Sequence, residues 1–169
     1  GNIDKLLIFP IFGALSLGNY NLAYQIFTLS MLLPIIVFQY VLPHDASGNK
    51  NTKLKKYAII LSGVITVLTI FLSPHVLPFL FYDFTDSIII IQIMSLALIP
   101  ATINLMLNSE FLGKEKSKIV LIGSGISVGT LSIGIIILGD IFGIIGIASS
   151  VVISRCCELT FLQYSKSKF

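Results

Sequence analysis

Long apolar stretches separated by short polar breaks dominate the chain. The pattern predicts helical segments over residues 3–17, 20–42, 57–81, 87–112, 119–138 and 143–164. About 20 apolar residues in a helix cross the hydrocarbon core of a bilayer, and the last five segments reach or approach that length. The run Ser87–Ile91 lacks the period-two alternation of an outer-membrane barrel. We therefore expect an all-α, polytopic membrane helical bundle.

The first segment is shorter than a full span and starts at the chain terminus. The chain begins with Gly1 instead of Met, and no basic leader with a cleavage site precedes the apolar pattern. We expect a piece of a longer protein, in which residues 1–169 form one bundle of about five full transmembrane helices and one truncated helix.

Composition supports the membrane interpretation. Of the residues, 55% are hydrophobic and 11% are charged, and the mean hydropathy is +0.96. A soluble domain carries about 25% charged residues, so soluble, disordered and disulfide-scaffold classes are excluded.

The basic residues in the breaks lie on alternate sides of the predicted spans. Three alternate regions carry Lys50, Lys53, Lys55, Lys56, Lys114, Lys116, Lys118, Lys166 and Lys168, and the opposite breaks carry only Asp83, Asp86 and Asp140. The positive-inside rule then predicts a multi-pass protein of the cytoplasmic membrane, with the lysines and the C-terminus in the cytoplasm. The net charge of +3 is a topology signal and does not indicate a nucleic-acid partner.

Arg155 and Glu158 are the most informative polar residues inside a predicted span. An unpaired arginine near the bilayer centre costs about 3 kcal/mol or more, and residues three apart share a helix face. The sequence predicts an intramembrane ion pair, which is either a structural element or part of a substrate path. Asp4 and Lys5 are either buried in the membrane or interfacial.

Other residues suggest packing and bending. Gln25 with Thr28, and Asn104 with Asn108, form polar stripes that either make interhelical hydrogen bonds or line a cavity. Gly125 and Gly129 predict a close helix–helix contact. Glu110 is expected at the membrane–water interface, close to the cytoplasmic lysines. Kinks are expected at Pro10, Pro34, Pro78 and Pro100.

Cys156 and Cys157 are interpreted as small apolar helix residues, with palmitoylation as the alternative. No metal-ligand spacing or phosphate loop is present in the sequence. We therefore expect no enzymatic activity, no cofactor and no metal.

An ordered set of short motifs resembles the C-terminal half of polysaccharide flippases in the multidrug/oligosaccharidyl-lipid/polysaccharide exporter superfamily. The set comprises Ile3-Asp4, Gly18–Tyr24, Val41-Leu42-Pro43, Leu98-Ile99-Pro100, Leu112-Gly113-Lys114 and Gly143–Ala148. Together these motifs extend over nearly the whole chain.

The resemblance implies one lobe of a two-lobe exporter that works by alternating access. Its partners would be the missing N-terminal lobe, the lipid bilayer and a polyprenyl-pyrophosphate-linked glycan, which is flipped from the cytoplasmic to the outer leaflet. It would place Asp4, Lys5, Tyr20, Tyr24 and Gln25 at or near the substrate path. Two alternatives stay open: a multidrug or cation exporter of the same superfamily, and a membrane scaffold subunit that does not transport.

Overall fold

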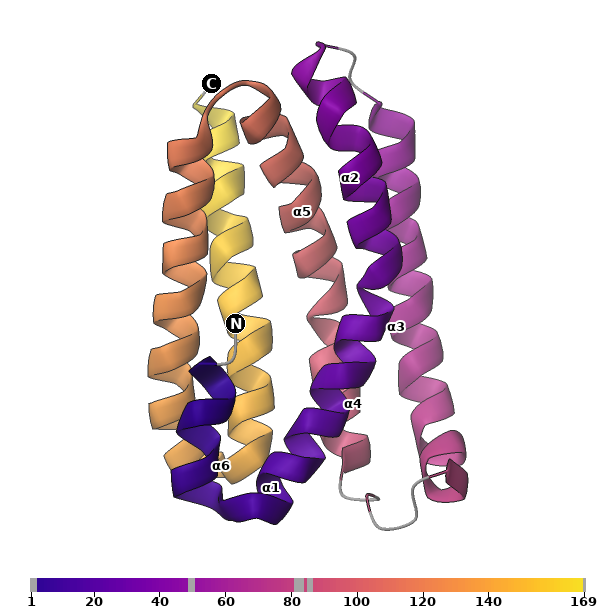
Figure 1. The fold of residues 1–169 in the computed structure, drawn as a ribbon, viewed down its shortest axis with the longest axis vertical. Coiled ribbons are helices and arrows are strands. Elements are labelled where there is room, and N and C mark those ends of the chain that lie inside the picture. The colour runs from indigo at the N-terminus through magenta and orange to yellow at the C-terminus, as the bar shows by residue number, and fades with distance from the viewer. Residues whose placement is uncertain (1–2, 49–50, 81–83, 85–86, 169) are drawn as a thin grey trace.

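The computed structural model describes residues 3–48, 51–80, 84 and 87–168, with the side chains of 3–16 and 80 left out. The described chain is all-α. Its helices are α1 (Ile3–Ser30), α2 (Leu32–Ala46), α3 (Thr52–Leu80), α4 (Ser87–Leu96), α5 (Leu98–Gly113) and α6 (Ser117–Ser167). They run roughly side by side along the long axis of the molecule (Figure 1). This arrangement confirms the predicted helical bundle.

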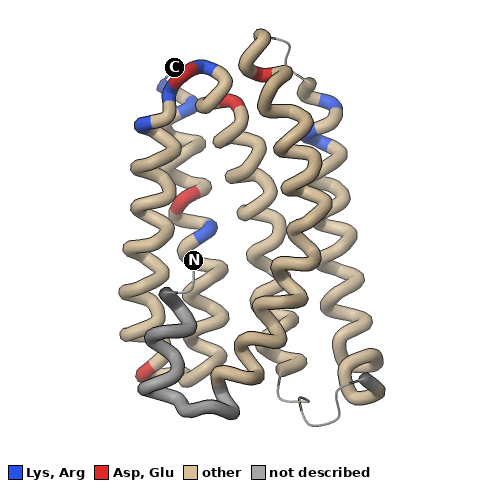
Figure 2. Tube along the Cα trace, in the orientation of Figure 1, with Lys and Arg blue, Asp and Glu red and all other residues tan. Residues whose placement is uncertain are grey.

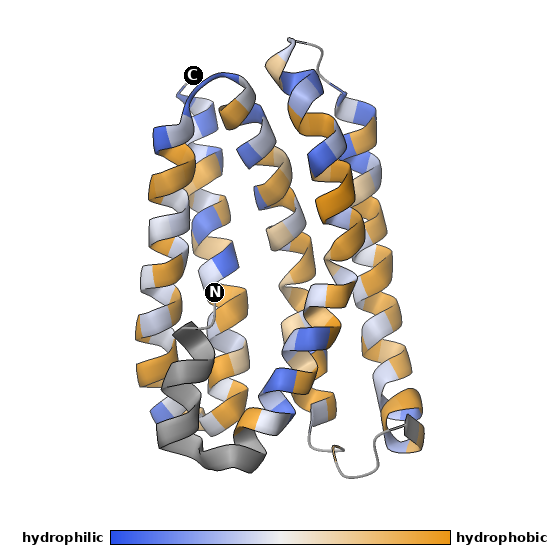
Figure 3. Ribbon diagram, viewed as in Figure 1, coloured by the Kyte–Doolittle hydropathy of each residue, from blue (hydrophilic) through white to orange (hydrophobic). Residues whose placement is uncertain are grey.

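Three helical stretches are long and apolar enough to cross a membrane: Thr52–Phe79, Ser87–Gly113 and Ser117–Ser167. The pair α1 and α2, bent by 40° between Leu17–Ser30 and Leu32–Ala46, could form a fourth. Apolar residues follow these helices along their length (Figure 3). Phe79 is 89% exposed and Leu121 is 75% exposed, and lipid tails would cover such outward-facing residues. The three to four candidate spans indicate a multi-pass membrane protein.

Prolines break two of the predicted segments. A proline at position i cannot bond to the carbonyl at i−4 and its ring clashes with that carbonyl. Pro34 follows the break at Met31, and Pro100 follows the break between α4 and α5 at Ala97. These two kinks were expected, whereas α3 continues through Pro74 and Pro78. The kink at Pro78 therefore stays a prediction, and the side chain of Pro10 lies outside the described residues.

No non-helical residue separates 17 from 20, because α1 is helical from Ile3 to Ser30. The α1 ribbon nevertheless turns sharply at the end of the bundle away from the C-terminus (Figure 1). The segment 20–42 is likewise not one straight helix, since Met31 divides it. Polar residues at Gly18-Asn19 indicated a break, but Asn19 is buried and its side-chain oxygen accepts a hydrogen bond from Ser87 Oγ (2.9 Å). Asn19 therefore joins α1 to α4 and does not end a helix.

Gly143 turns α6 back on itself. Its φ of 61° and ψ of −139° are non-helical, and the positive φ suits glycine. We call residues 117–142 the first arm of α6 and residues 144–167 the second arm. The two arms lie side by side (Figure 1), and the expected break before 143 matches this reversal.

Close glycine contacts hold the two arms together. A methyl group at Gly123 would meet Leu162, one at Gly134 would meet Ser150, and one at Gly146 would overlap the Leu138 carbonyl. In contrast, Gly125 and Gly129 have open space where a side chain would begin. The predicted Gly125–Gly129 contact is therefore wrong within the described chain, because both residues point away from the neighbouring helices.

Charge gathers at one end of the bundle. We call this end the lysine-bearing end. Helices α2 and α5 finish there, α3 begins there, and α6 both starts its first arm and ends its second arm there (Figure 2). Lys50, Asp83 and Asp86 lie outside the described residues, and Asp140 sits near the opposite end beside the Gly143 reversal. The lysines of the polar breaks that the structure describes thus share one end, as the alternating breaks predicted.

Helices α4 and α5 form the centre of the bundle. Helix α4 packs against α1, α3 and α6, and α5 packs against α2, α3 and α6. The main core contains Tyr20, Ile91, Met94, Leu98 and Ile147, all nearly inaccessible. This core fixes the spacing between α1 and the two arms of α6, and therefore the shape of the cavity between them.

Candidate functional site

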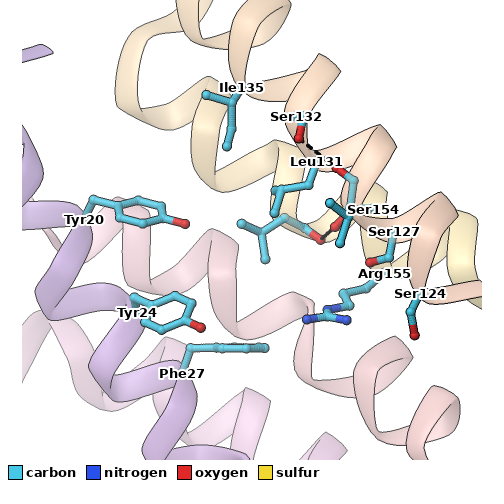
Figure 4. Close-up of a pocket in the computed structure, with 12 residues that line it drawn as sticks. Tyr20, Tyr24, Phe27, Ser124, Ser127, Leu131, Ser132, Ile135, Ser154 and Arg155 are labelled. Atoms are coloured by element: carbon cyan, nitrogen blue, oxygen red, sulfur yellow. Dashed lines mark hydrogen bonds between the residues drawn. The ribbon is translucent and has the colours of Figure 1, made fainter. Parts of the chain in front are cut away.

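A cavity of about 180 Å³ lies between α1 and the two arms of α6. Tyr20, Tyr24 and Phe27 line it from α1, and serines and Arg155 line it from α6 (Figure 4). The three aromatic residues occur at spacings of four and three, so they share one helix face. Adjacent ring centroids are 6.2 Å and 6.4 Å apart. Hydroxyl groups, one cation and aromatic rings therefore meet in one partly enclosed space.

Serine hydroxyls supply much of the polar lining. Ser132 Oγ donates to the Val128 carbonyl (2.9 Å) and Ser154 Oγ donates to the Val151 carbonyl (2.8 Å). Donation within the helix uses the single hydroxyl proton and leaves oxygen lone pairs as acceptors. This wall of the cavity can thus accept hydrogen bonds from a visiting group.

Arg155 and Glu158 form an ion pair on the second arm of α6. Arg155 Nη1 lies 3.1 Å from Glu158 Oε2, with the spacing of three residues that places both side chains on one face. The side chain of Arg155 is 40% exposed, whereas that of Glu158 is 4% exposed. By its position in the chain, the pair lies midway along the second arm, with Glu158 about two turns before Lys166.

A second cavity, of about 140 Å³, lies on the other side of Arg155. Asn104 and Asn108 line it from α5, Glu158 lines it from α6, and the two cavities share Phe27 and Arg155. We call these two cavities together the Arg155 site.

Several polar atoms at the Arg155 site are unsatisfied. Asn104 Nδ2 donates to the Arg155 carbonyl (3.0 Å), which joins α5 to α6 and fixes the amide orientation. Its oxygen, the oxygen of Asn108 and Arg155 Nε are buried without a hydrogen-bond partner among the described residues. A buried unsatisfied polar group costs about 1–3 kcal/mol. A water or ligand that reached these atoms would remove that cost.

A different group of charges occupies the lysine-bearing end. Lys55 Nζ lies 2.7 Å from Asp45 Oδ2 and 3.1 Å from Glu110 Oε1, and Lys166 Nζ lies 2.7 Å from Glu110 Oε2. Ser109 Oγ donates to Asp45 Oδ2 (2.6 Å). We call these five residues the Lys55 cluster. It joins α2, α3, α5 and α6.

The sequence interpretation missed the Lys55 cluster. Lys55 was assigned to a polar break between spans, but it lies in α3 and is buried, and Asp45 was not singled out. Glu110 does lie beside lysines at this end, as expected. A cavity of about 180 Å³ lies next to the cluster, between Asp45, Glu110 and Lys114.

The predicted path residues have different locations in the structure. Tyr20 and Tyr24 lie at the Arg155 site, with Tyr20 fully buried. Gln25 is exposed and lines none of the cavities described above. The side chains of Asp4 and Lys5 lie outside the described residues. The structure thus brings two of the five predicted path residues together with Arg155.

The polar stripes have mixed outcomes. Asn104 makes an interhelical hydrogen bond and also lines a cavity, so both interpretations of that stripe apply. Thr28 instead donates to the Tyr24 carbonyl of its own helix. Among the described residues, no three His, Cys, Asp or Glu side chains are close enough to hold a metal ion.

An apolar groove of about 260 Å³ lies along α1, α3 and α4, between Ile26, Leu72 and Ile91. In contrast to the Arg155 site, its lining is almost entirely hydrocarbon.

No protein-family model, curated protein or solved structure matches this chain.

Proposed function

We propose that this chain is one lobe of a membrane transporter that flips a polyprenyl-linked oligosaccharide from the cytoplasmic to the outer leaflet. The single observation that carries the proposal is the Arg155 site, where an ion pair and several hydroxyl groups line cavities midway along apolar helices. Polar groups at that depth are expensive, and they commonly mark a transport path. A polar cavity of this kind would shelter a glycan while the prenyl chain stayed in lipid.

The ordered motifs that resemble polysaccharide flippases support the same proposal. In this interpretation the two arms of α6 are separate spans, the bent α1–α2 pair is one span, and α3 and α4–α5 are two more. That makes five spans after the start of α1. The lysine-bearing end would then face the cytoplasm.

The two rival functions receive less support. A cation exporter needs a carboxylate that is available to its cargo, but Glu158 at this site is bonded to Arg155. A scaffold subunit would act through helix packing and would not need buried polar cavities.

The test is glycan export in cells that make the intact protein. Deleting the protein should cause the lipid-linked glycan to accumulate in the inner leaflet and to disappear from the surface. Tyr24→Leu should lower export about fivefold, because it removes a polar contact worth ~1 kcal/mol at the cavity. Leu29→Ala, on the lipid-facing side of the same helix, is the control and should export normally at equal protein level. Normal glycan export after deletion would overturn the proposal.

A further inference from the structure

We propose that the Arg155 site takes an uncharged polyhydroxyl group, such as a sugar ring, and does not take a phosphate. This inference rests on the proposed function, because it specifies which part of a lipid-linked glycan the site contacts. Its three arguments are charge, hydrogen-bonding capacity and size.

The first argument is charge. Of the described residues that line the two cavities, Arg155 and Glu158 carry charge, and they are paired at 3.1 Å. The positive charge that would attract a phosphate is therefore already neutralised. A phosphate entering the site would also approach the Glu158 carboxylate and be repelled by it.

The second argument is hydrogen-bonding capacity. Asn104 and Asn108 each have an unsatisfied oxygen at the site, and Ser132 and Ser154 have already used their protons. These atoms need donors, which an ionised phosphate cannot supply because its oxygens only accept. Hydroxyl groups both donate and accept, so a sugar can satisfy these oxygens and also accept from Arg155 Nε. The unsatisfied atoms are covered in this structure, so a ligand reaches them only when the cavity wall parts.

The third argument is size and surface. The cavities have volumes of about 180 and 140 Å³, whereas one water needs only ~10–15 Å³ on this measure, so each has room for a group much larger than a water. Phe27 lies between them and Tyr24 beside it, so each cavity combines an aromatic wall with a hydroxyl or amide wall. A sugar ring has this combination of apolar C–H faces and polar edges.

The first experiment removes one acceptor. Ser132→Ala deletes a hydroxyl at the cavity, and Ser149→Ala deletes one with the same within-helix bond, to the Ile145 carbonyl, outside both cavities. Measured as glycan export by the intact protein in cells, Ser132→Ala should lower the rate about fivefold and Ser149→Ala should not change it. Equal export by the two variants at equal protein level would overturn the inference.

The second experiment needs no transport and probes charge directly with inorganic pyrophosphate. A Ser124→Cys variant of the intact protein, with Cys156 and Cys157 changed to Ser, is labelled with a maleimide at the exposed cavity position. Pyrophosphate should leave the labelling rate unchanged. A slower rate at Ser124→Cys, with no change in a Ser47→Cys control, would overturn the inference.

Adding Glu158→Gln to the Ser124→Cys variant supplies the positive control, because it frees Arg155 from its partner. Pyrophosphate should now slow labelling, and no slowing would contradict the argument that the ion pair neutralises the site. If deletion of the protein leaves glycan export intact, the proposed function fails, whatever these labelling rates show about the chemistry of the site.

Discussion

Two groups of opposite charges among the described residues are built differently. In the Lys55 cluster, Lys55 is buried and is held by carboxylates from two other helices, at 2.7 and 3.1 Å. At the Arg155 site the pair comes from a single helix, and its arginine is 40% exposed to a cavity. The first group joins four helices and leaves one buried oxygen, Asp45 Oδ1, unsatisfied. The second lies on one helix beside two cavities and leaves Arg155 Nε and two neighbouring amide oxygens unsatisfied.

This difference suggests a division of roles. A buried ion pair that ties distant helices together has its main effect on the folded state, because removing one partner leaves a buried charge. A pair on one helix whose arginine is partly exposed to a cavity joins no distant helices, but it presents charge and hydrogen-bonding groups to a ligand. Variants of the two groups should therefore separate stability from function.

The largest effect is expected for Lys55→Met. The substitution keeps the length of the side chain but leaves Asp45 buried without its cation and Glu110 with only Lys166. We expect a loss of ~3–5 kcal/mol in the free energy of unfolding, measured by thermal unfolding in detergent. Lys56→Met, at an exposed neighbouring position, is the matched control. Equal stability of the two variants would show that the Lys55 cluster does not hold the helices together.

The next largest effect is expected for Gly134→Ala, which tests the support of the Arg155 site. The new methyl carbon would lie 2.7 Å from Ser150 Oγ and 2.8 Å from Ser150 Cβ, so the two arms of α6 would have to separate. We expect a loss of ~1–3 kcal/mol. Gly125→Ala has open space and should change stability by less than ~0.5 kcal/mol. Thermal unfolding of both variants checks this expectation. A larger loss of stability for Gly125→Ala than for Gly134→Ala would show that the two arms of α6 do not make their close contact at Gly134.

The features that could be predicted from the sequence depend on neighbours in the chain. Apolar runs predicted the helices, Pro34 and Pro100 predicted two kinks, and the break between segments 119–138 and 143–164 predicted the reversal of α6. The Arg155–Glu158 pair follows from helix geometry, since residues three apart share a face. Each of these inferences needs only local rules.

The features that were missed depend on which helices become neighbours. Asp45, Lys55 and Glu110 meet because three helices finish or begin at the same end, and no spacing in the chain records this. The motif at Gly125 and Gly129 permits close packing without saying which side faces a neighbour, and here it faces away. Gln25 was likewise assigned to a path by resemblance, but helix rotation leaves it exposed.

A smaller effect on stability is expected for Glu158→Gln. The amide keeps the shape of the side chain, and Arg155 can turn toward water in the cavity because it is 40% exposed. We expect the free energy of unfolding to change by no more than ~1 kcal/mol. Thermal unfolding of Glu158→Gln and Lys55→Met under the same conditions compares the two losses directly. A loss as large as that of Lys55→Met would assign the Arg155–Glu158 pair a structural role.

The smallest effect is expected for Lys166→Met, within the Lys55 cluster itself. The Lys166 side chain is 53% exposed, and its partner Glu110 keeps the bond to Lys55. An exposed pair contributes ~0.2–1 kcal/mol and is screened by salt, whereas a buried pair is screened much less. Lys166→Met should therefore lower stability slightly at low ionic strength and hardly at all at about 1 M salt, where the Debye length is ~3 Å. The deficit of Lys55→Met should persist under both conditions, because salt does not reach the buried carboxylates. If the stability losses of both variants disappeared at high salt, the ion pairs of buried Lys55 would be screened as strongly as the pair of exposed Lys166.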